Sequence, residues 1–140
     1  SPAIHAALAA RVGHLDDVVR YSQMAATVDL GDGMGNAAHG VHVATMGGLW
    51  QAAVMGCGGL RSSRGALSLD PVLPDAWPSL RFPIRWRGAR VELAITADEL
   101  TLDLDGDLDL ILGANAEGRL RAGLYRSTRQ QGAWSRLEKV

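Results

Sequence analysis

A polar, glycine-rich loop that leads directly into an apolar helix is the one stretch of this sequence where chemistry could be concentrated. It extends from Asp29 to Leu60. Glycines give the backbone conformations that other residues rarely reach, and loops carry function more often than the scaffold does. The polar and glycine residues before the helix are Asp29, Gly31, Asp32, Gly33, Gly35, Asn36, His39, Gly40, His42 and Thr45.

The acidic run around Asp105 was compared with a calcium-binding loop. Asp103, Asp105 and Asp107 have the alternate spacing of such a loop. Glycine is absent at the sixth position, and Ala114 occupies the twelfth position, where a bidentate glutamate belongs. A β-hairpin is therefore the better interpretation of this run.

Zinc and nucleotide sites do not fit the glycine-rich loop. His39 and His42 are three residues apart, without a third ligand at a recognisable spacing. No Gly-Lys-Ser/Thr follows the glycines, as a Walker loop requires, and no predicted strand precedes them, as a dinucleotide fingerprint requires. We therefore predict no metal and no cofactor.

An oxyanion or phosphate site remains at the start of the apolar helix. Backbone N–H groups at a helix N-terminus, together with the helix dipole, bind anions. His42 and Thr45 lie at that start, and Gly47 and Gly48 allow close approach of another group. Tight helix packing through small residues explains the same pattern, so both interpretations stay open.

The length, net charge and composition of the chain exclude several classes of protein. The chain has 140 residues, a net charge of −1 and 47% hydrophobic residues, which suits one compact domain or a small domain joined to part of another. It lacks the basic excess of a nucleic-acid binder, an apolar run of roughly 20 residues and a signal-peptide pattern. We expect no nucleic acid, no membrane and a cytoplasmic location. The single Cys57 is predicted to be a buried structural thiol.

Three helices are predicted in the first sixty residues. Ser1 and Pro2 begin the first, which ends at Gly13 and carries Ile4, Leu8 and Val12 on one face. The second begins after His14 and has one face formed by Leu15, Val18, Val19, Ser22 and Ala26. The third, near Val43 to Gly56, is apolar nearly all round, which predicts burial on every side by further helices or a partner. Because the chain opens on SPAIHAAL, we expect it to be a fragment.

From Leu67 onward the hydrophobic period changes to two, which predicts strands. A Gly88-Ala89 turn pairs Trp86 with Val91, Ile84 with Leu93 and Phe82 with Ile95. A turn at Ala97-Asp98 brings Leu100, Leu102 and Leu104 opposite Ile95, Leu93 and Val91, and a three-residue loop at 105–107 pairs Leu104 with Leu108. One more strand over Leu120, Ala122 and Leu124 is expected before a solvated tail.

A series of motifs over residues 1–104 resembles a known family. They are Asp29-Leu30, Gly35-Asn36, the run GVHVATMGG at 40–48, Trp50, Gly56, Gly58-Gly59-Leu60, LSLDP at 67–71, Leu73-Pro74, Trp77, Leu80, Phe82 and Trp86-Arg87-Gly88. In this order they closely resemble the C-terminal part of the glycoside hydrolase family 65 enzymes, which include the maltose, trehalose and kojibiose phosphorylases.

The resemblance implies an α+β fold: the final helices of an (α/α)6 barrel, followed by a small antiparallel, sandwich-like β-sheet domain. The expected segments are 1–60, with the terminal barrel helices and the phosphate loop; 61–115, the β-sheet domain; and 116–140, a last strand and polar tail.

The resemblance also implies roles for single residues. The run at 40–48 would line the site for inorganic phosphate, the co-substrate that displaces glucose from a disaccharide with inversion. His42 would donate to a phosphate oxygen, Thr45 would supply a hydroxyl where serine is usual, and Gly47 and Gly48 would permit close backbone contact. Leu49 departs from the threonine common in the family. The family's general acid is a glutamate far upstream, which none of Glu92, Glu99, Glu117 and Glu138 matches, so no catalytic residue is expected in this chain.

We therefore expect the C-terminal portion of an inverting α-glucoside phosphorylase, inactive alone. Its partners would be a disaccharide, phosphate and the missing N-terminal part, with a homodimer left open. Two alternatives remain: a trehalase-like hydrolase of the same family, in which water replaces phosphate, and a stand-alone structural or carbohydrate-binding β module. The β face lacks the exposed aromatic platform of sugar binders, because Phe82 and Trp86 alternate with the leucine side.

Overall fold

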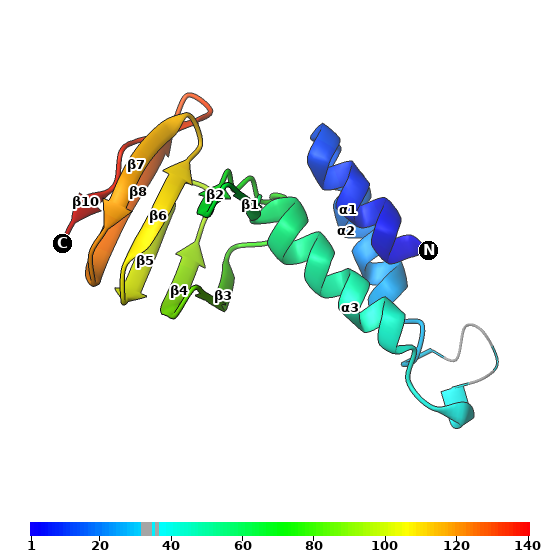
Figure 1. The fold of residues 1–140 in the computed structure, drawn as a ribbon. Helices are drawn as coiled ribbons and strands as arrows, with labels where there is room; N and C mark the ends of the chain where they lie inside the picture. The colour runs from blue at the N-terminus through cyan, green and yellow to red at the C-terminus, as the bar shows by residue number, and fades with distance from the viewer. Residues whose placement is uncertain (32–34, 36) are drawn as a thin grey trace. The chain divides into compact units, whose positions relative to one another are not determined.

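A helical unit and a β unit make up the chain. In the computed structural model, the helical unit is Ser1–Cys57 and the β unit is Gly58–Val140 (Figure 1). Residues 1–31, 35 and 37–140 are described. Asp32, Gly33 and Asn36 of the glycine-rich loop lie outside the described residues. The division falls close to the boundary expected at residue 60.

The helical unit contains three α-helices in the predicted order. They are α1 (Pro2–Val12), α2 (Leu15–Ala26) and α3 (Val43–Gln51); the 3₁₀ helix η1 (Ala37–His39) precedes α3, and the π-helix η2 (Ala52–Cys57) continues it. Ser1 is the N-cap of α1, and Gly13 ends α1 in the left-handed region with φ 80°. The predicted helical hairpin with a very short connection is therefore confirmed. None of the described helices is long and apolar enough to cross a bilayer.

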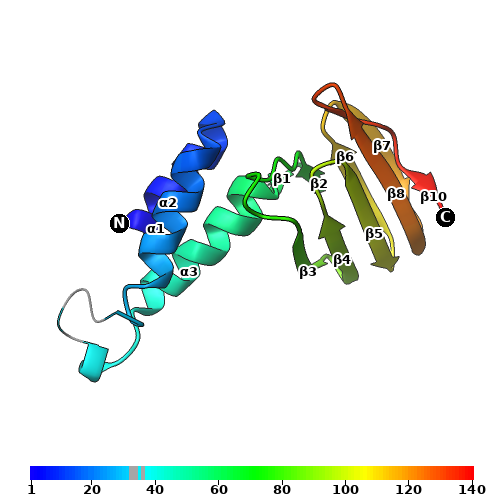
Figure 2. The same ribbon diagram turned by 180° about the vertical axis from the view of Figure 1, so that it is seen from behind.

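Small residues, rather than the large apolar ones, form the packing face of α1. Its buried residues are Ala3, Ala6 and Ala9, whereas Ile4, Leu8 and Val12 are 58%, 53% and 67% exposed. The face that carries Ile4, Leu8 and Val12 is therefore the exposed face of α1 within this unit. Alanines let two helix backbones approach closely, and α1 contacts α2, α3 and η2 (Figure 2).

Helix α3 meets α1 through glycine. A Cβ added to Gly48 would lie 2.6 Å from the Cβ of Ala3, and one added to Gly56 would lie 2.9 Å from the Cβ of Ala10. Burial of this helix on every side was predicted, but no residue of α3 is buried and Trp50 is 49% exposed. Helices α1 and α2 contact α3, and η2 continues it, so the described part of the helical unit covers only part of the α3 surface.

Two sheets form the β unit, and each buries one leucine-rich face. The first has the order β1 (Arg61–Ser63), β2 (Ala66–Leu69), β6 (Leu108–Leu112), β7 (Asn115–Leu120). The second has the order β10 (Glu138–Lys139), β8 (Gly123–Gln130), β5 (Glu99–Asp105), β4 (Ala89–Ile95), β3 (Leu80–Trp86), with β9 (Ala133–Trp134) paired to β8. All pairs are antiparallel except β2 with β6. The whole chain is thus a mixed helix and sheet protein, with the alternating burial typical of a sandwich.

One predicted turn is confirmed and a second is wrong. Strands β4 and β5 pair as expected, with Ile95 opposite Leu100. The β3–β4 register differs by two residues, since Ile84 pairs with Val91 and the turn is Arg87-Gly88. Both turn residues have positive φ, 49° and 83°, as a type I′ turn requires, and glycine fits its second position. Two further turns have the same pattern, Arg64-Gly65 and Gln131-Gly132.

The predicted hairpin at 105–107 does not form. Strand β5 pairs with β8 instead, with Leu102 opposite Tyr125, and β6 pairs with β2 in the other sheet. A shift of a strand by two residues, or to another leucine-rich partner, keeps every apolar side chain on the same face. The alternation could therefore not distinguish these partners.

Residues 116–140 form strands rather than a solvated tail. They include most of β7 and all of β8, β9 and β10. Trp134 is only 6% exposed, and its Nε1–H donates to the carbonyl of Pro71 at 3.0 Å. The carboxylate of Glu117 accepts the N–H of Leu137 at 3.0 Å. Long-range contacts of this kind give no local signal in a polar sequence.

We expect Gly48→Ala to be less stable than Gly47→Ala by about 1–3 kcal/mol, the usual cost of overpacking. Both substitutions gain the same helix propensity, but only the new Cβ at residue 48 meets Ala3, while a Cβ at residue 47 meets no atom within 4 Å. Urea unfolding of the two variants, followed by circular dichroism, measures the difference. A Gly48→Ala variant as stable as Gly47→Ala would contradict this packing.

Trp134→Ala should destabilise the β unit by about 3–5 kcal/mol, because it leaves a cavity and an unpaired Pro71 carbonyl. The matched control is Ile111→Ala in the same unit, where the side chain is 38% exposed. Its expected cost is about 1 kcal/mol or less. Equal shifts of the two urea midpoints would show that the C-terminal strands contribute little to the unit.

Candidate functional site

The carboxylate of Asp29 binds His42 twice. Its Oδ2 accepts the backbone N–H of His42 at 2.9 Å, and its Oδ1 makes a short contact with the ring Nδ1 of His42. The side chain of Asp29 is 14% exposed, and that of His42 is 26% exposed. The two residues are thirteen positions apart, so this contact closes the loop between α2 and α3.

Local structure brings Asp29 to this position. Helix α2 ends at Thr27, whose hydroxyl donates to the carbonyl of Gln23 at 2.9 Å, and whose carbonyl accepts the N–H of Gly31 at 2.8 Å. The chain therefore keeps a helical turn beyond α2 before it leaves for the loop. Asp29 lies within that turn.

Hydrogen bonding lowers the pKa of Asp29. The largest cause is the side-chain bond with His42, followed by the bond from the His42 backbone N–H; both favour the charged carboxylate. Desolvation opposes them and is the smaller effect. The loop therefore holds a fixed negative charge next to the ring.

Helix α3 begins at this contact. His42 is its N-cap, and the amides of Thr45 and Met46 both donate to the His42 carbonyl, at 2.9 and 3.1 Å. The His42 side chain itself makes no capping hydrogen bond to the helix. The amides of Val43 and Ala44, in the first turn, consequently have no acceptor within the helix.

The Thr45 hydroxyl is released from a capping role. In a capping box, the third residue of the helix accepts the N–H of the N-cap residue. Here Asp29 accepts that N–H. Thr45, which is half-buried, therefore keeps its hydroxyl for another partner.

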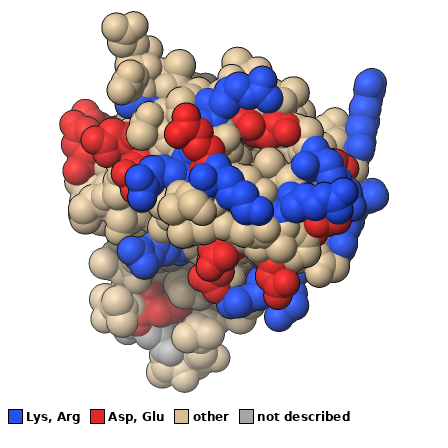
Figure 3. All heavy atoms as spheres, turned by 90° about the vertical axis from the view of Figure 1, so that its left-hand side faces the viewer, with Lys and Arg blue, Asp and Glu red and all other residues tan. Residues whose placement is uncertain are grey.

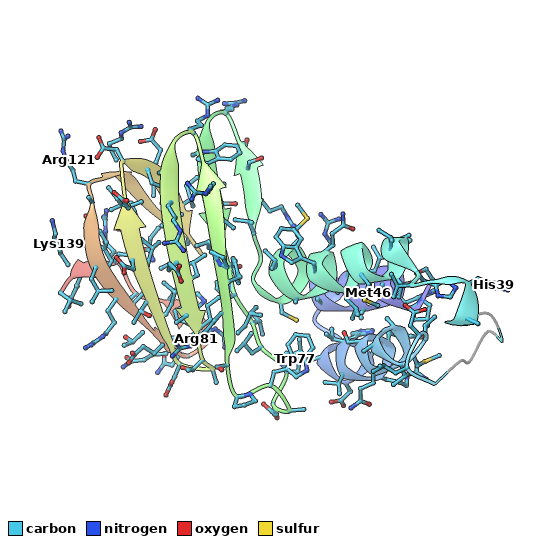
Figure 4. All side chains as sticks on the ribbon, turned by 90° about the horizontal axis from the view of Figure 1, so that it is seen from below. His39, Met46, Trp77, Arg81, Arg121 and Lys139 are labelled. Atoms are coloured by element: carbon cyan, nitrogen blue, oxygen red, sulfur yellow. The ribbon has the colours of Figure 1, made fainter. Side chains whose placement is uncertain are left out.

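The four predicted site residues divide into two pairs. His42 and Thr45 share the first turn of α3, with η1 and His39 directly before it (Figure 4). Gly47 is two positions beyond Thr45, so the two residues do not share a helix face. Gly48 packs against Ala3, which is the helix-packing interpretation of the glycines. Within the part of the chain that the structure describes, the first turn of α3 thus brings together His42, Thr45 and the amides of Val43 and Ala44, while Gly48 faces Ala3.

Cys57 has no chemistry to offer at this site. Its side chain is 1% exposed, and burial raises the pKa of its thiol to about 11. The prediction of a buried structural thiol is confirmed. Among the described residues, no three His, Cys, Asp or Glu side chains cluster closely enough to hold a metal ion.

Asp29 is the residue of the candidate site that the sequence does not single out. In the sequence it is one of several polar groups of the loop, without a distinct role. It lies thirteen positions before His42, and no periodic spacing links a loop carboxylate to a helix N-cap across such a gap. Only the folded loop reveals the pair.

Comparison with known proteins finds the same family on both sides of the unit boundary. Residues 1–51 match the glycosyl hydrolase family 65 central catalytic domain, and residues 60–113 match the glycosyl hydrolase family 65 C-terminal domain. The chain belongs to glycosyl hydrolase family 65. The resemblance predicted from the motifs is confirmed.

Several relatives are phosphorylases. The chain is 37% identical to a kojibiose phosphorylase of Halothermothrix orenii over 107 residues, and 36% identical to an alpha,alpha-trehalose phosphorylase of Thermoanaerobacter brockii over 104 residues. These alignments cover 76% and 74% of this chain, but only 14% and 13% of the relatives. An uncharacterised glycosyl hydrolase of Mycobacterium tuberculosis is 42% identical over 104 residues, which is 74% of this chain and 13% of that protein.

A solved structure shares the fold of this family 65 chain. It is named as a kojibiose phosphorylase from the human microbiome, and it matches with a TM-score of 0.83 at 23% identity. The match covers 93% of this chain and 19% of that one. The succession of helices and sheets described above is therefore the fold of this part of a known protein.

We expect a carbon-detected NMR titration to place the pKa of Asp29 below its ordinary value of 3.8. His42→Ala should raise it, because the largest cause of the shift is lost, although the backbone N–H remains. Since the folded-state pKa is lowered, the contact stabilises the loop above about pH 4 and is lost as pH falls through the folded-state pKa. An Asp29 pKa that is the same in both proteins would contradict the observed pairing.

Proposed function

We propose that this chain is the C-terminal part of an inverting disaccharide phosphorylase, and that it supplies phosphate-binding groups and no catalytic acid. The observation that carries the proposal is the arrangement at the start of α3. There, a half-buried His42 held by Asp29, the Thr45 hydroxyl and two amides without helical acceptors lie within one turn. Helix N-termini with such donors are suited to phosphate.

The proposed reaction divides the chemistry between this chain and the remainder of the enzyme. A phosphate oxygen attacks the anomeric carbon of the sugar, and the bond from that carbon to the glycosidic oxygen breaks. The departing oxygen takes a proton from a general acid outside this chain, and inversion follows because attack and departure occur on opposite faces. The products are a sugar 1-phosphate and the second sugar.

The glutamates of this chain support the placement of the acid elsewhere. Glu92 pairs with Arg90, and the carboxylate of Glu99 lies 3.8 Å from Arg126. Glu117, whose side chain is 4% exposed, binds the backbone of Leu137 and lies 3.9 Å from Arg136. Each of these carboxylates already serves the β unit.

Exposed apolar faces support the proposal that further helices complete an (α/α)6 barrel. Leu8 on α1 and Trp50 on α3 are 53% and 49% exposed. A groove of about 220 Å³, which Leu8 and Met55 help to line, runs between α1 and the end of the α3–η2 helix. Large apolar side chains in these positions are typical of a surface that another part of a protein covers.

The second candidate is a hydrolase of the same family, in which water attacks the anomeric carbon. The 42% identical mycobacterial relative carries the name glycosyl hydrolase, without an assigned substrate. The several hydrogen-bond donors at the start of α3 would suit phosphate. They favour phosphorolysis over hydrolysis, because an attacking water needs one general base rather than several donors.

A stand-alone sugar-binding module fits less well. Across 58–140, all of which is described, Phe82, Tyr125 and Trp134 are buried, and Trp77 and Trp86 are half-buried. On the face in Figure 3, basic and acidic side chains are mixed; printed pairs of the β unit include Arg90 with Glu92 and Arg119 with Asp109. Across 58–140 the aromatic side chains therefore form no exposed platform, and the face in Figure 3 carries charges of both signs. A cytoplasmic location and a homodimer remain predictions.

The test is an assay of the full-length enzyme with kojibiose or trehalose. We expect sugar 1-phosphate to form only when inorganic phosphate is present. His42→Ala should raise KM for phosphate about 10- to 100-fold, the usual contribution of a hydrogen bond to a charged group. Thr45→Val should raise it about 2- to 10-fold, as a neutral hydroxyl contributes less.

Thr101→Val is the matched control, since Thr101 is a half-buried threonine of β5 and has no place in the site. Its KM for phosphate should equal that of the wild type. Disaccharide cleavage that proceeds at full rate without phosphate would overturn the phosphorylase proposal in favour of the hydrolase.

A further inference from the structure

We infer that Asp29 is the positioning residue of this site: its carboxylate fixes the ring of His42 with Nδ1–H directed to Oδ1, and leaves Nε2 as the nitrogen that meets the ligand. The nature of the ligand rests on the proposed function. The ring orientation and its tautomer do not, because they follow from contacts within the chain.

One rigid group makes both contacts. The two oxygens of a single carboxylate bind the backbone N–H and the ring Nδ1 of the same residue. The backbone bond fixes where His42 begins α3, and the ring bond then limits the side-chain torsions that remain. A ring held at one nitrogen and partly enclosed, with 26% of the side chain exposed, has one nitrogen left for substrate.

The chemistry of the carboxylate decides the proton positions. An ionised carboxylate only accepts hydrogen bonds, so Nδ1 must carry the hydrogen. In the neutral ring, Nε2 is then an acceptor, and it becomes a donor only in the doubly protonated ring. An unprotonated phosphate oxygen needs a donor. A His42 ring that donates to such an oxygen through Nε2 is therefore an imidazolium between two anions, with a charge-assisted bond on each side.

The sequence around the site adds a reason for this charge. Between Arg20 and Arg61 there is no lysine or arginine. Within this part of the chain, a histidine is the only side chain that can bring positive charge to an anion. His39, the other histidine of the loop, is exposed and has no recorded partner among the described residues.

An asparagine at position 29 would reverse the arrangement. Its single carbonyl oxygen is needed by the His42 backbone N–H, so its NH₂ group faces Nδ1. The ring must then accept at Nδ1 and carry its hydrogen on Nε2, and the imidazolium is disfavoured because two donors would meet. Residues 29 and 42 together have zero net charge both in the wild type with a protonated ring and in Asp29→Asn with a neutral ring. A difference in phosphate binding between the two proteins is thus caused by the hydrogen bond between these residues and not by a change in their net charge.

Nitrogen-15 NMR of the labelled histidine rings in the full-length enzyme tests the inference without any ligand. We expect neutral His42 to carry its hydrogen on Nδ1 in the wild type and on Nε2 in Asp29→Asn, with both proteins folded. Asp29→Glu, which keeps a carboxylate, should restore the Nδ1–H form. The matched control is Asp16→Asn, an exposed acid of α2, which should leave the His42 signals unchanged. A wild-type His42 with hydrogen on Nε2, or no change in Asp29→Asn, would overturn the inference.

Kinetics of the full-length enzyme separate this inference from the proposed function. Asp29→Asn should raise KM for inorganic phosphate about tenfold, the difference between a charge-assisted and a neutral hydrogen bond, while kcat and KM for the disaccharide stay within about twofold. If His42→Ala raises KM for phosphate and Asp29→Asn does not, the positioning role is wrong and the proposed function stands. If neither His42→Ala nor Asp29→Asn changes KM for phosphate but the His42 tautomer reverses as expected, the positioning role stands and the phosphate assignment is wrong.

Discussion

The double contact between Asp29 and His42 is the constraint on which the helical unit's functional end depends. It closes the loop between α2 and α3, supplies the acceptor for the N-cap amide, and fixes the ring at one nitrogen. A loop rich in glycine loses much conformational entropy when it is ordered. A pair of hydrogen bonds to one charged group offsets part of that loss at the point where the helix begins.

Small residues explain how three helices hold together while exposing large apolar side chains. Ala3 meets Gly48, and Ala10 meets Gly56, so the backbones of α1 and α3–η2 lie close together. Leucine and tryptophan side chains on the outer faces are then free to contact other parts of a larger protein. These exposed apolar side chains on two helices are the reason for the proposal that further helices cover them.

The C-terminal residues contribute more contacts to the β unit than their polar composition would predict. The Trp134 indole donates to the Pro71 carbonyl, 63 residues earlier, and the nearly buried carboxylate of Glu117 holds the backbone of Leu137. Charged and polar residues in this stretch are not merely solvated, because several of them satisfy backbone groups. The last strands β9 and β10 thereby become part of the sandwich.

The sequence by itself determined the three helices, the change from helix to strand, the β4–β5 turn and the family, because periodicity, caps and motif order are local properties. It also placed His42 and Thr45 at the start of a helix. Only the tertiary structure decided strand partners and helix faces, since a leucine-rich strand fits any leucine-rich neighbour equally well. It alone revealed Asp29 as the partner of His42, because a contact between residues thirteen positions apart in a loop depends on the path of the folded chain.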